Sequence, residues 1–166
     1  MNKLLRLLLL AGLVVLAIWA WRTFSRDPKT IVRRQLEKIA RLASFPPNTG
    51  NLSRVAEVQR LGRLFAEDAQ VTLDAPGVEA HTFNGRAELM QAAMVAKSLG
   101  NGLKVEFLDM NIEMGEGAKS ALVDLTLKAR IGGENDIIAQ ELKFTLKLID
   151  GEWLVTRVES VPTLKP

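Results

Sequence analysis

The stretch HTFNGRAELM, residues 81–90, predicts the point at which a short strand gives way to a helix. The pair Asn84-Gly85 breaks the strand, because glycine adopts left-handed backbone conformations that other residues avoid. From Arg86 to Leu99 apolar residues recur at helical spacing, and a Gly-Asn-Gly triplet closes the run. The stretch also contains His81, the only histidine of a chain without cysteine or tyrosine. His81 is therefore either a catalytic group at a pocket mouth or an ordinary strand residue.

Two helices are expected before this stretch. Asp27 followed by Pro28 is typical of a helix start, with an N-cap acceptor and a proline at the first helical position. This helix should stop before Pro46 and Pro47. After the polar loop NTGN, a second helix is predicted from one apolar stripe, made of Val55, Val58, Leu61, Leu64 and Phe65.

Strands occupy the rest of the predicted domain. From Gln70 the apolar period is two, a turn follows at Pro76-Gly77, and residues 78–83 form a second short strand. Residues 104–114, 119–131, 138–148 and 152–161 predict an antiparallel meander, with a hairpin turn at Asp150-Gly151. In the first of these four strands the alternation of apolar and polar residues shifts by one residue near Asp109, which indicates a bulge and a bend. The order predicts an α+β fold with helices gathered on one face of a strongly curved antiparallel sheet.

Two motifs and the element order resemble the nuclear transport factor two-like, or SnoaL-like, superfamily, which has a cystatin-like α+β cone. The motifs are FNGRAEL at 83–89 and LIDGEWLVTRVE at 148–159, and the resemblance covers about residues 27–162. It implies a cone-shaped sheet with three helices packed on its concave face and an apolar cavity beneath them. It also implies that some relatives place an acid, a base or an oxyanion donor in the cavity, and that many dimerise.

The resemblance suggests one catalytic pair. Cyclase-like members use an aspartate and a histidine, and Asp74 and His81 are the nearest candidates, on two strands joined through Pro76-Gly77. In the alternative interpretation, His81 shares the exposed face of a short edge strand with Glu79. The isomerase oxyanion arrangement, which needs a tyrosine, cannot be carried over. Candidates for lining a ligand pocket are Met90, Met94, Phe107, Asp109, Gln140, Phe144 and Trp153.

No metal or cofactor is expected. One histidine and no cysteine leave little scope for zinc. GEGAKS at 115–120 lacks the glycine that a phosphate loop has before its lysine, and a strand follows where a helix is needed. DMNIE at 109–113 lacks the glycine of a calcium loop, and Ser120 stands where its last glutamate belongs.

Residues 1–26 are expected to be an N-terminal membrane anchor with a basic flank. Leu4 to Trp21 spans about 27 Å as a transmembrane helix, close to the thickness of a hydrocarbon core. Trp19 and Trp21 lie where an aromatic belt belongs, and the sites for signal cleavage are poor. We expect a single-pass protein with an extracytoplasmic, periplasmic domain. A secreted protein after signal cleavage, a buried helix and a cytoplasm-facing domain are the alternatives.

Charge is distributed unevenly along the chain. Residues 22–63 carry ten Lys or Arg against three acids, whereas residues 64–166 carry ten against sixteen. Anionic headgroups would attract the basic part, which follows the apolar segment. A solvated helix face is the simpler alternative. Nucleic acid is not an expected partner, because the cations have no interleaved aromatics and match no known reader motif.

The sequence therefore favours a non-enzymatic domain, residues 27–166, tethered to a membrane through residues 4–21. Its cone cavity or sheet face would bind a small apolar ligand or a protein partner. One alternative is an isomerase, cyclase or hydrolase that uses Asp74 and His81. Another is a scaffold subunit of a membrane complex, because assembly factors of type IV secretion systems share the tether-plus-cone architecture. A homodimer through the sheet would suit that role, although a charged sheet face suits it less.

Overall fold

The computed structural model describes residue 14 and residues 27–48, 50–74, 80–98, 101–132 and 137–161. Apart from residue 14, the expected anchor at residues 1–26 lies outside the described residues. None of the helices within these ranges is long and apolar enough to span a membrane.

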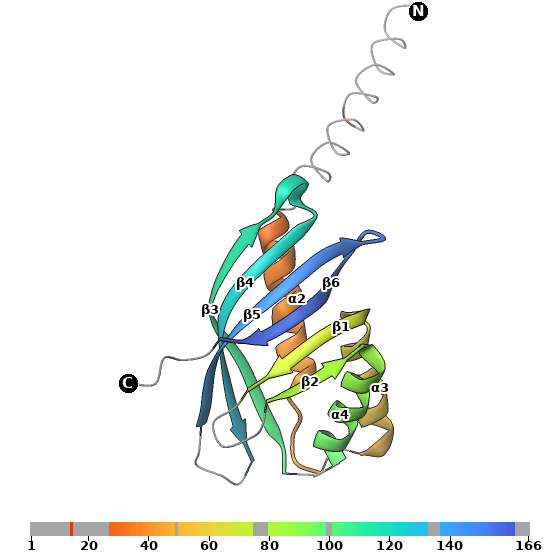
Figure 1. The fold of residues 1–166 in the computed structure, drawn as a ribbon. Coiled ribbons are helices and arrows are strands. Elements are labelled where there is room, and N and C mark those ends of the chain that lie inside the picture. The colour runs from red at the N-terminus through yellow and green to blue at the C-terminus, as the bar shows by residue number, and fades with distance from the viewer. Residues whose placement is uncertain are drawn as a thin grey trace, which may run out of the picture.

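The described chain forms helices and strands in the predicted α+β order (Figure 1). The helices are α2 (Pro28–Ala43), α3 (Asn51–Gly62) and α4 (Arg86–Ser98), with a 3-10 turn η1 (Glu116–Ala118). The strands are β1 (Phe65–Leu73), β2 (His81–Asn84), β3 (Leu103–Met114), β4 (Ser120–Ile131), β5 (Ile137–Ile149) and β6 (Glu152–Ser160).

The strands form one six-stranded sheet in the order β2-β1-β6-β5-β4-β3. Neighbours are antiparallel except β1 and β6, which are parallel, so the prediction of a wholly antiparallel sheet is wrong at this pair. The reason is the crossover through α4. Because α4 carries the chain back along the sheet, β2 and β3 run in the same direction, and the meander that follows ends parallel to β1.

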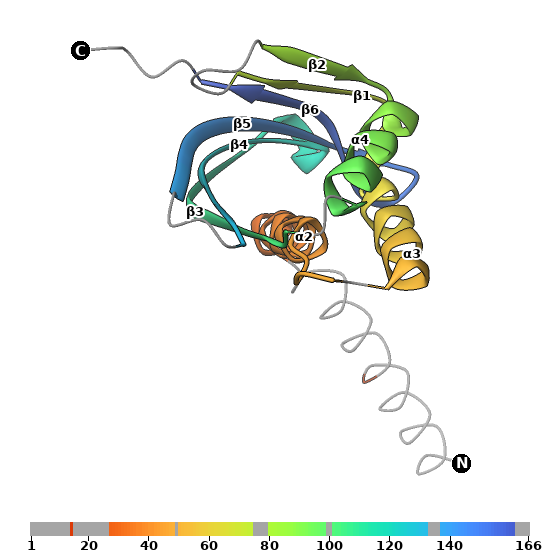
Figure 2. The same ribbon diagram turned by 90° about the horizontal axis from the view of Figure 1, so that it is seen from below.

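The sheet curves around α2, as Figure 2 shows along the helix axis. α2 packs mainly against β3, α4 packs against β1 and β2, and α3 packs against both α4 and α2. The largest side chains with less than 2% exposure come from α2, α3 and the inner sheet face: Leu36, Leu146, Val32, Val58, Val123 and Val155. The space between α2 and the sheet is therefore a packed core.

The first strand begins earlier than predicted. We expected Leu64 and Phe65 on the second helix, but α3 ends at Gly62 and β1 starts at Phe65. The N–H of Val155 donates to the carbonyl oxygen of Leu64 at 3.0 Å, and Phe65 pairs with Val155 in the sheet. This pairing with the last strand holds the segment extended, and local periodicity does not reveal it.

The predicted bulge and hairpin are both confirmed. The pairing of β3 with β4 shifts between Leu108 and Asn111, and Asp109 has a φ of 51°. Asp150 and Gly151 have φ values of 51° and 82°, as a tight hairpin turn requires. Both features could be predicted because a local change of pattern or a turn dipeptide encodes them.

Candidate functional site

The residues of HTFNGRAELM that follow the histidine have structural roles at the junction of β2 and α4. Gly85 has a φ of 83°, and its N–H donates to the carbonyl oxygen of Ala69 at 2.7 Å. The N–H of Asn84 donates to Oε2 of Glu88 at 2.6 Å, which caps the start of α4. The motif therefore joins a strand to a helix and leaves few groups free for chemistry.

Arg86 was not anticipated as an important residue. Its Nε and Nη2 atoms donate to the carbonyl oxygen of Phe65 at 2.9 and 2.7 Å, and its side chain is half-buried. A cation in the first turn of a helix opposes the helix dipole. This unfavourable placement is the one sequence signal that Arg86 has a tertiary partner.

His81 lies on the edge strand β2, opposite Leu73 of β1, and is exposed. Its ring contacts Phe83 edge-to-face, with 4.5 Å between the ring centroids. The position agrees with the interpretation of His81 as an exposed edge-strand residue.

Asp74 is exposed and follows the last residue of β1. Its N–H donates to Oγ of Ser160 at 2.9 Å, and its carbonyl oxygen accepts from Nε2 of Gln140. These contacts use the backbone of Asp74, where the ends of β1, β5 and β6 meet. In the described part of the chain, no hydrogen bond or ion pair joins the side chains of Asp74 and His81.

The pocket candidates lie in separate parts of the fold. Phe107 and Phe144 contact each other edge-to-face in the core, with centroids 5.5 Å apart, and Trp153 is buried near Gln35. Met90 packs against Gly62 between α3 and α4, and Met94 is half-buried further along α4. Gln140 bonds to Asp74, and Asp109 is exposed at the bulge of β3.

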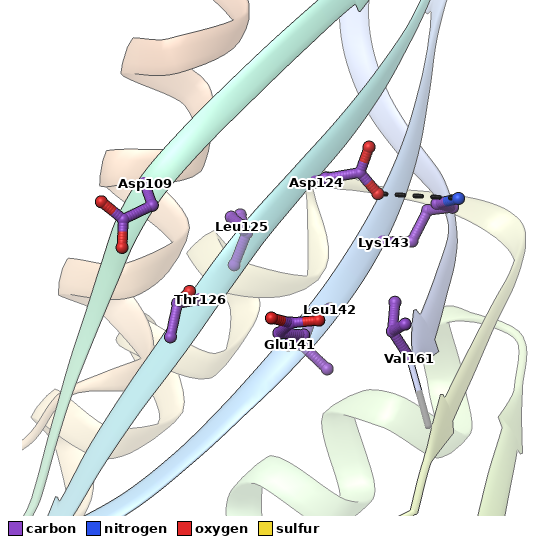
Figure 3. Close-up of a pocket in the computed structure, with 8 residues that line it drawn as sticks. All are labelled: Asp109, Asp124, Leu125, Thr126, Glu141, Leu142, Lys143 and Val161. Atoms are coloured by element: carbon purple, nitrogen blue, oxygen red, sulfur yellow. Dashed lines mark ion pairs between the residues drawn. The ribbon is translucent and has the colours of Figure 1, made fainter. Parts of the chain in front are cut away.

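An open hollow of about 310 Å³ lies on the sheet face that points away from α2. We call it the outer-face hollow (Figure 3); it is lined by Asp109, Asp124, Leu125, Thr126, Glu141, Leu142, Lys143 and Val161. Two structural irregularities frame it. The bulge bends β3 at Asp109, and β6 ends beside β5, where the N–H of Val161 donates to the carbonyl oxygen of Glu141 at 2.9 Å.

The outer-face hollow has an apolar floor of Leu125, Leu142 and Val161, and the charged side chains around it carry excess negative charge. Lys143 and Asp124 form an ion pair at 3.6 Å, with 41% and 46% of their side chains exposed. Asp109 and Glu141 form no ion pair with another described residue. No group of three or more acidic or histidine side chains in the described ranges could hold a metal ion. The hollow can accept hydrogen bonds and attract cationic groups.

The same sheet face carries charges beyond the hollow. Lys104 on β3 forms an ion pair with Glu106 at 2.9 Å. The Lys104 ammonium lowers the pKa of the Glu106 carboxyl, and Lys128 and Arg130 on β4 lower it further. On β6, Arg157 pairs with Glu159 at 2.7 Å. These pairs agree with the charged sheet face that is expected from the sequence.

A second hollow, of about 490 Å³, lies along α2. We call it the α2 hollow; its lining residues are Asp27, Thr30, Ile31, Arg34, Gln35, Lys38 and Arg41. Among these seven described residues three are cations and one, Asp27, is an acid, so the charge that they carry is opposite to that of the outer-face hollow.

No family model and no curated protein matches the chain. Solved structures do match, including a cystatin-like, nuclear transport factor two-like protein from Novosphingobium aromaticivorans. That match has a TM-score of 0.61 and 15% identity, and it covers 96% of this chain and 90% of the other. Another structure from that organism, provisionally named a scytalone dehydratase, has a TM-score of 0.61 and 17% identity over 81% of this chain and 84% of its own.

A chain from the yeast complex of the deubiquitinase Ubp3 and its cofactor Bre5 is a third similar structure. Its TM-score is 0.59 at 14% identity, over 84% of this chain and all of the other. Together these matches confirm the nuclear transport factor two-like, cystatin-like fold predicted from the sequence. At such low identity, the likeness extends to the fold and not to an activity.

Proposed function

We propose that this chain is a non-enzymatic, membrane-tethered domain that recognises a protein partner through its outer-face hollow. The observation that carries the proposal is the hollow itself, which gathers Asp109, Asp124, Thr126, Glu141 and Lys143 from three strands on one open surface. Exposed charges of both signs orient a partner and reject wrong ones.

A protein partner fits this surface better than a small apolar ligand. Sites for small ligands are concave and mainly apolar, and they bury most of the ligand. The side chains of Leu36, Val123 and Leu146 instead fill the space beneath α2 as a packed core. The outer-face hollow is open, and the charged side chains of β4 and β5 surround its apolar floor.

The anchor supports an interaction role as well. Residues 27–166 would form the binding domain, and residues 4–21 would hold it at the membrane, on the extracytoplasmic side. A tether raises the effective concentration of a partner at the same membrane without any new contact. A scaffold subunit of a membrane complex is one form of this function.

An enzyme that uses Asp74 and His81 has less support. A catalytic base must come within hydrogen-bond reach of its proton, or within reach through one water. The exposed ring of His81 lies on the edge strand, and the backbone of Asp74 bonds to Ser160 and Gln140. The provisional dehydratase name belongs to a structural neighbour at 17% identity.

Site-specific photo-cross-linking tests the partner directly. The chain has no cysteine, so Thr126→Cys places one cross-linker in the outer-face hollow. Gln59→Cys, at an exposed position of α3, is the matched control. We expect the Thr126 position alone to form an adduct with one membrane-associated protein. Adding Glu141→Lys should weaken that adduct several-fold, because a cross-interface charge pair contributes about 1.5 kcal/mol or more.

Equal adducts from both positions would contradict the proposal. An adduct between two copies of the chain would replace the partner with a homodimer. An apolar molecule that co-purifies with the chain and is displaced by Phe107→Trp would instead support a ligand in the cone.

A further inference from the structure

The outward face of α2 is strongly basic. Its exposed residues occupy one side of the helix, opposite the buried stripe of Val32, Leu36 and Ile39. That side presents five cations and a single acid, Glu37, in the set Lys29, Thr30, Arg33, Arg34, Glu37, Lys38 and Arg41. We call it the α2 basic face.

These cations are not neutralised within the described part of the chain. The ion pairs there involve Lys97, Lys104, Lys143 and Arg157, none of which belongs to α2. Arg33 makes one long hydrogen bond, from Nη2 to the carbonyl oxygen of Met110 at 3.4 Å. The charge of the face is therefore available to an external anion.

The α2 hollow gives this face a concave part. Arg34, Lys38 and Arg41 line it together with the polar side chains of Thr30 and Gln35. Asp27, the one acid among its described lining residues, is the N-cap of the helix. It accepts hydrogen bonds from the N–H of Lys29 at 3.1 Å and from Oγ1 of Thr30 at 3.3 Å. The hollow thus offers several cationic donors around a space of about 490 Å³.

We propose that the α2 basic face lies on an anionic phospholipid surface, with headgroup phosphates in the α2 hollow. This inference rests on the membrane anchor of the proposed function. It concerns a different face of the domain from the outer-face hollow. Trp21, at the end of the apolar segment, is seven residues before Pro28. Those residues can extend at most about 25 Å, so an anchor at residues 4–21 keeps the start of α2 close to the bilayer.

Charge elsewhere in the chain favours the same orientation. Residues 64–166 carry sixteen acids against ten Lys or Arg, so this part of the chain has a net negative charge. An anionic surface repels that net charge. The large exposed apolar side chains of the described domain lie outside α2, so the basic face would bind headgroups without inserting. Binding of this kind weakens as salt screens the charges.

The test uses the full chain reconstituted in phosphatidylcholine vesicles, with or without roughly 30% phosphatidylglycerol. A fluorophore on Thr30→Cys reports contact through quenching by a headgroup-labelled lipid, and a fluorophore on Gln59→Cys is the control position. We expect quenching at Thr30 to be at least about twofold stronger in the anionic vesicles, and high salt to remove the difference.

Charge reversal provides the matched control. Reversal of Arg34, Lys38 and Arg41 to Glu should abolish the lipid-dependent difference. Reversal of three exposed cations elsewhere should preserve it: Lys119 at the end of η1, Arg130 on β4 and Lys147 on β5. Equal quenching in the two kinds of vesicle, or a difference that survives the α2 reversal, would overturn the proposal. Competition by inorganic phosphate at constant ionic strength would assign the hollow to a free anion instead. If the full chain floats with neither kind of vesicle, both this proposal and the membrane anchor of the proposed function are refuted. Cross-linking at Thr126 tests the outer-face hollow separately.

Discussion

Gly85 joins β2 to α4 with a φ of 83° and lies close to another backbone segment. A Cβ there would stand 3.1 Å from the carbonyl oxygen of Glu67, whereas at Gly151, with a φ of 82°, it would meet nothing within 4 Å. Gly151→Ala should therefore cost only the left-handed penalty of about 1–2 kcal/mol, and Gly85→Ala should cost more. Urea unfolding measures both free energies. Equal costs would show that the contact with Glu67 contributes nothing.

Arg86 holds the start of β1 from the first turn of α4. Replacing it by Gln removes two donors from the carbonyl oxygen of Phe65, so Arg86→Gln should destabilise the domain by about 1–3 kcal/mol. The control is Arg130→Gln on an exposed strand position, with an expected change within about 0.5 kcal/mol. Thermal unfolding of both variants is the measurement, and a similar small effect at Arg86 would mean that water replaces its bonds.

At the scale of elements, the bulge of β3 depends on the left-handed backbone of Asp109. Glycine adopts this conformation freely and a β-branched residue resists it. We expect Asp109→Gly to be neutral or slightly stabilising and Asp109→Val to cost about 1–2 kcal/mol. Melting temperatures of the two variants compare them directly. A Val variant as stable as the Gly variant would mean that the bulge can move to another residue.

The pairing of α3 with α4 contains a buried charge. Lys97 is 2% exposed, its Nζ atom lies 2.7 Å from Oε2 of Glu57, and it stands 5.1 Å from the ring centre of Phe45. Glu57→Gln leaves the ammonium buried without its counter-charge, at a cost of about 3 kcal/mol. Restoring stability with the double variant Glu57→Gln/Lys97→Met would confirm that the unpaired charge is the cause, and no loss in the single variant would contradict it.

Elements that short sequence patterns specify were predictable from the sequence. Elements whose position depends on contacts with residues far away in the chain were not. The start of α2 at Pro28, the hairpin at Asp150-Gly151 and the bulge near Asp109 follow from short patterns. The early start of β1 and its parallel pairing with β6 depend on residues about ninety positions apart. Likewise, the sequence presents Lys97 as an ordinary cation in the last turn of a helix. Lys97 is buried because α3 packs against α4, and this contact could not be predicted from the sequence.

The candidate site was less predictable than the fold. Alternation in β4 and β5 identified a charged sheet face, and the phase slip identified the bend at Asp109. Asp109 is the one pocket candidate that also lines the outer-face hollow. The others were chosen for an enclosed cone cavity, but Phe144 and Trp153 belong to the core. Neither the position where β6 ends nor the curvature of the sheet is encoded locally, so the hollow could not be inferred.

At the scale of the whole molecule, the two proposed surfaces lie on opposite sides of the domain. α2 occupies the concave side of the sheet (Figure 2) and turns its basic face away from the sheet. The outer-face hollow opens on the other side, with α2 behind the strands that line it (Figure 3). Contact of α2 with a bilayer therefore leaves the hollow free for a partner. The opposite charges of the two surfaces favour this single orientation at an anionic membrane.

The folded domain should be separable from the first 26 residues at a defined place. The core begins with Val32 and Leu36 of α2, each 0% exposed, and Trp153 is the only tryptophan after Trp21. We expect residues 27–166 to fold cooperatively, with coincident transitions in far-UV circular dichroism and Trp153 fluorescence. A chain starting at Glu37 loses both side chains, each contributing about 1.5–3 kcal/mol, out of a typical total of 5–15 kcal/mol. It should therefore be unfolded or close to it, and equal stability of the two chains would place the domain boundary inside α2.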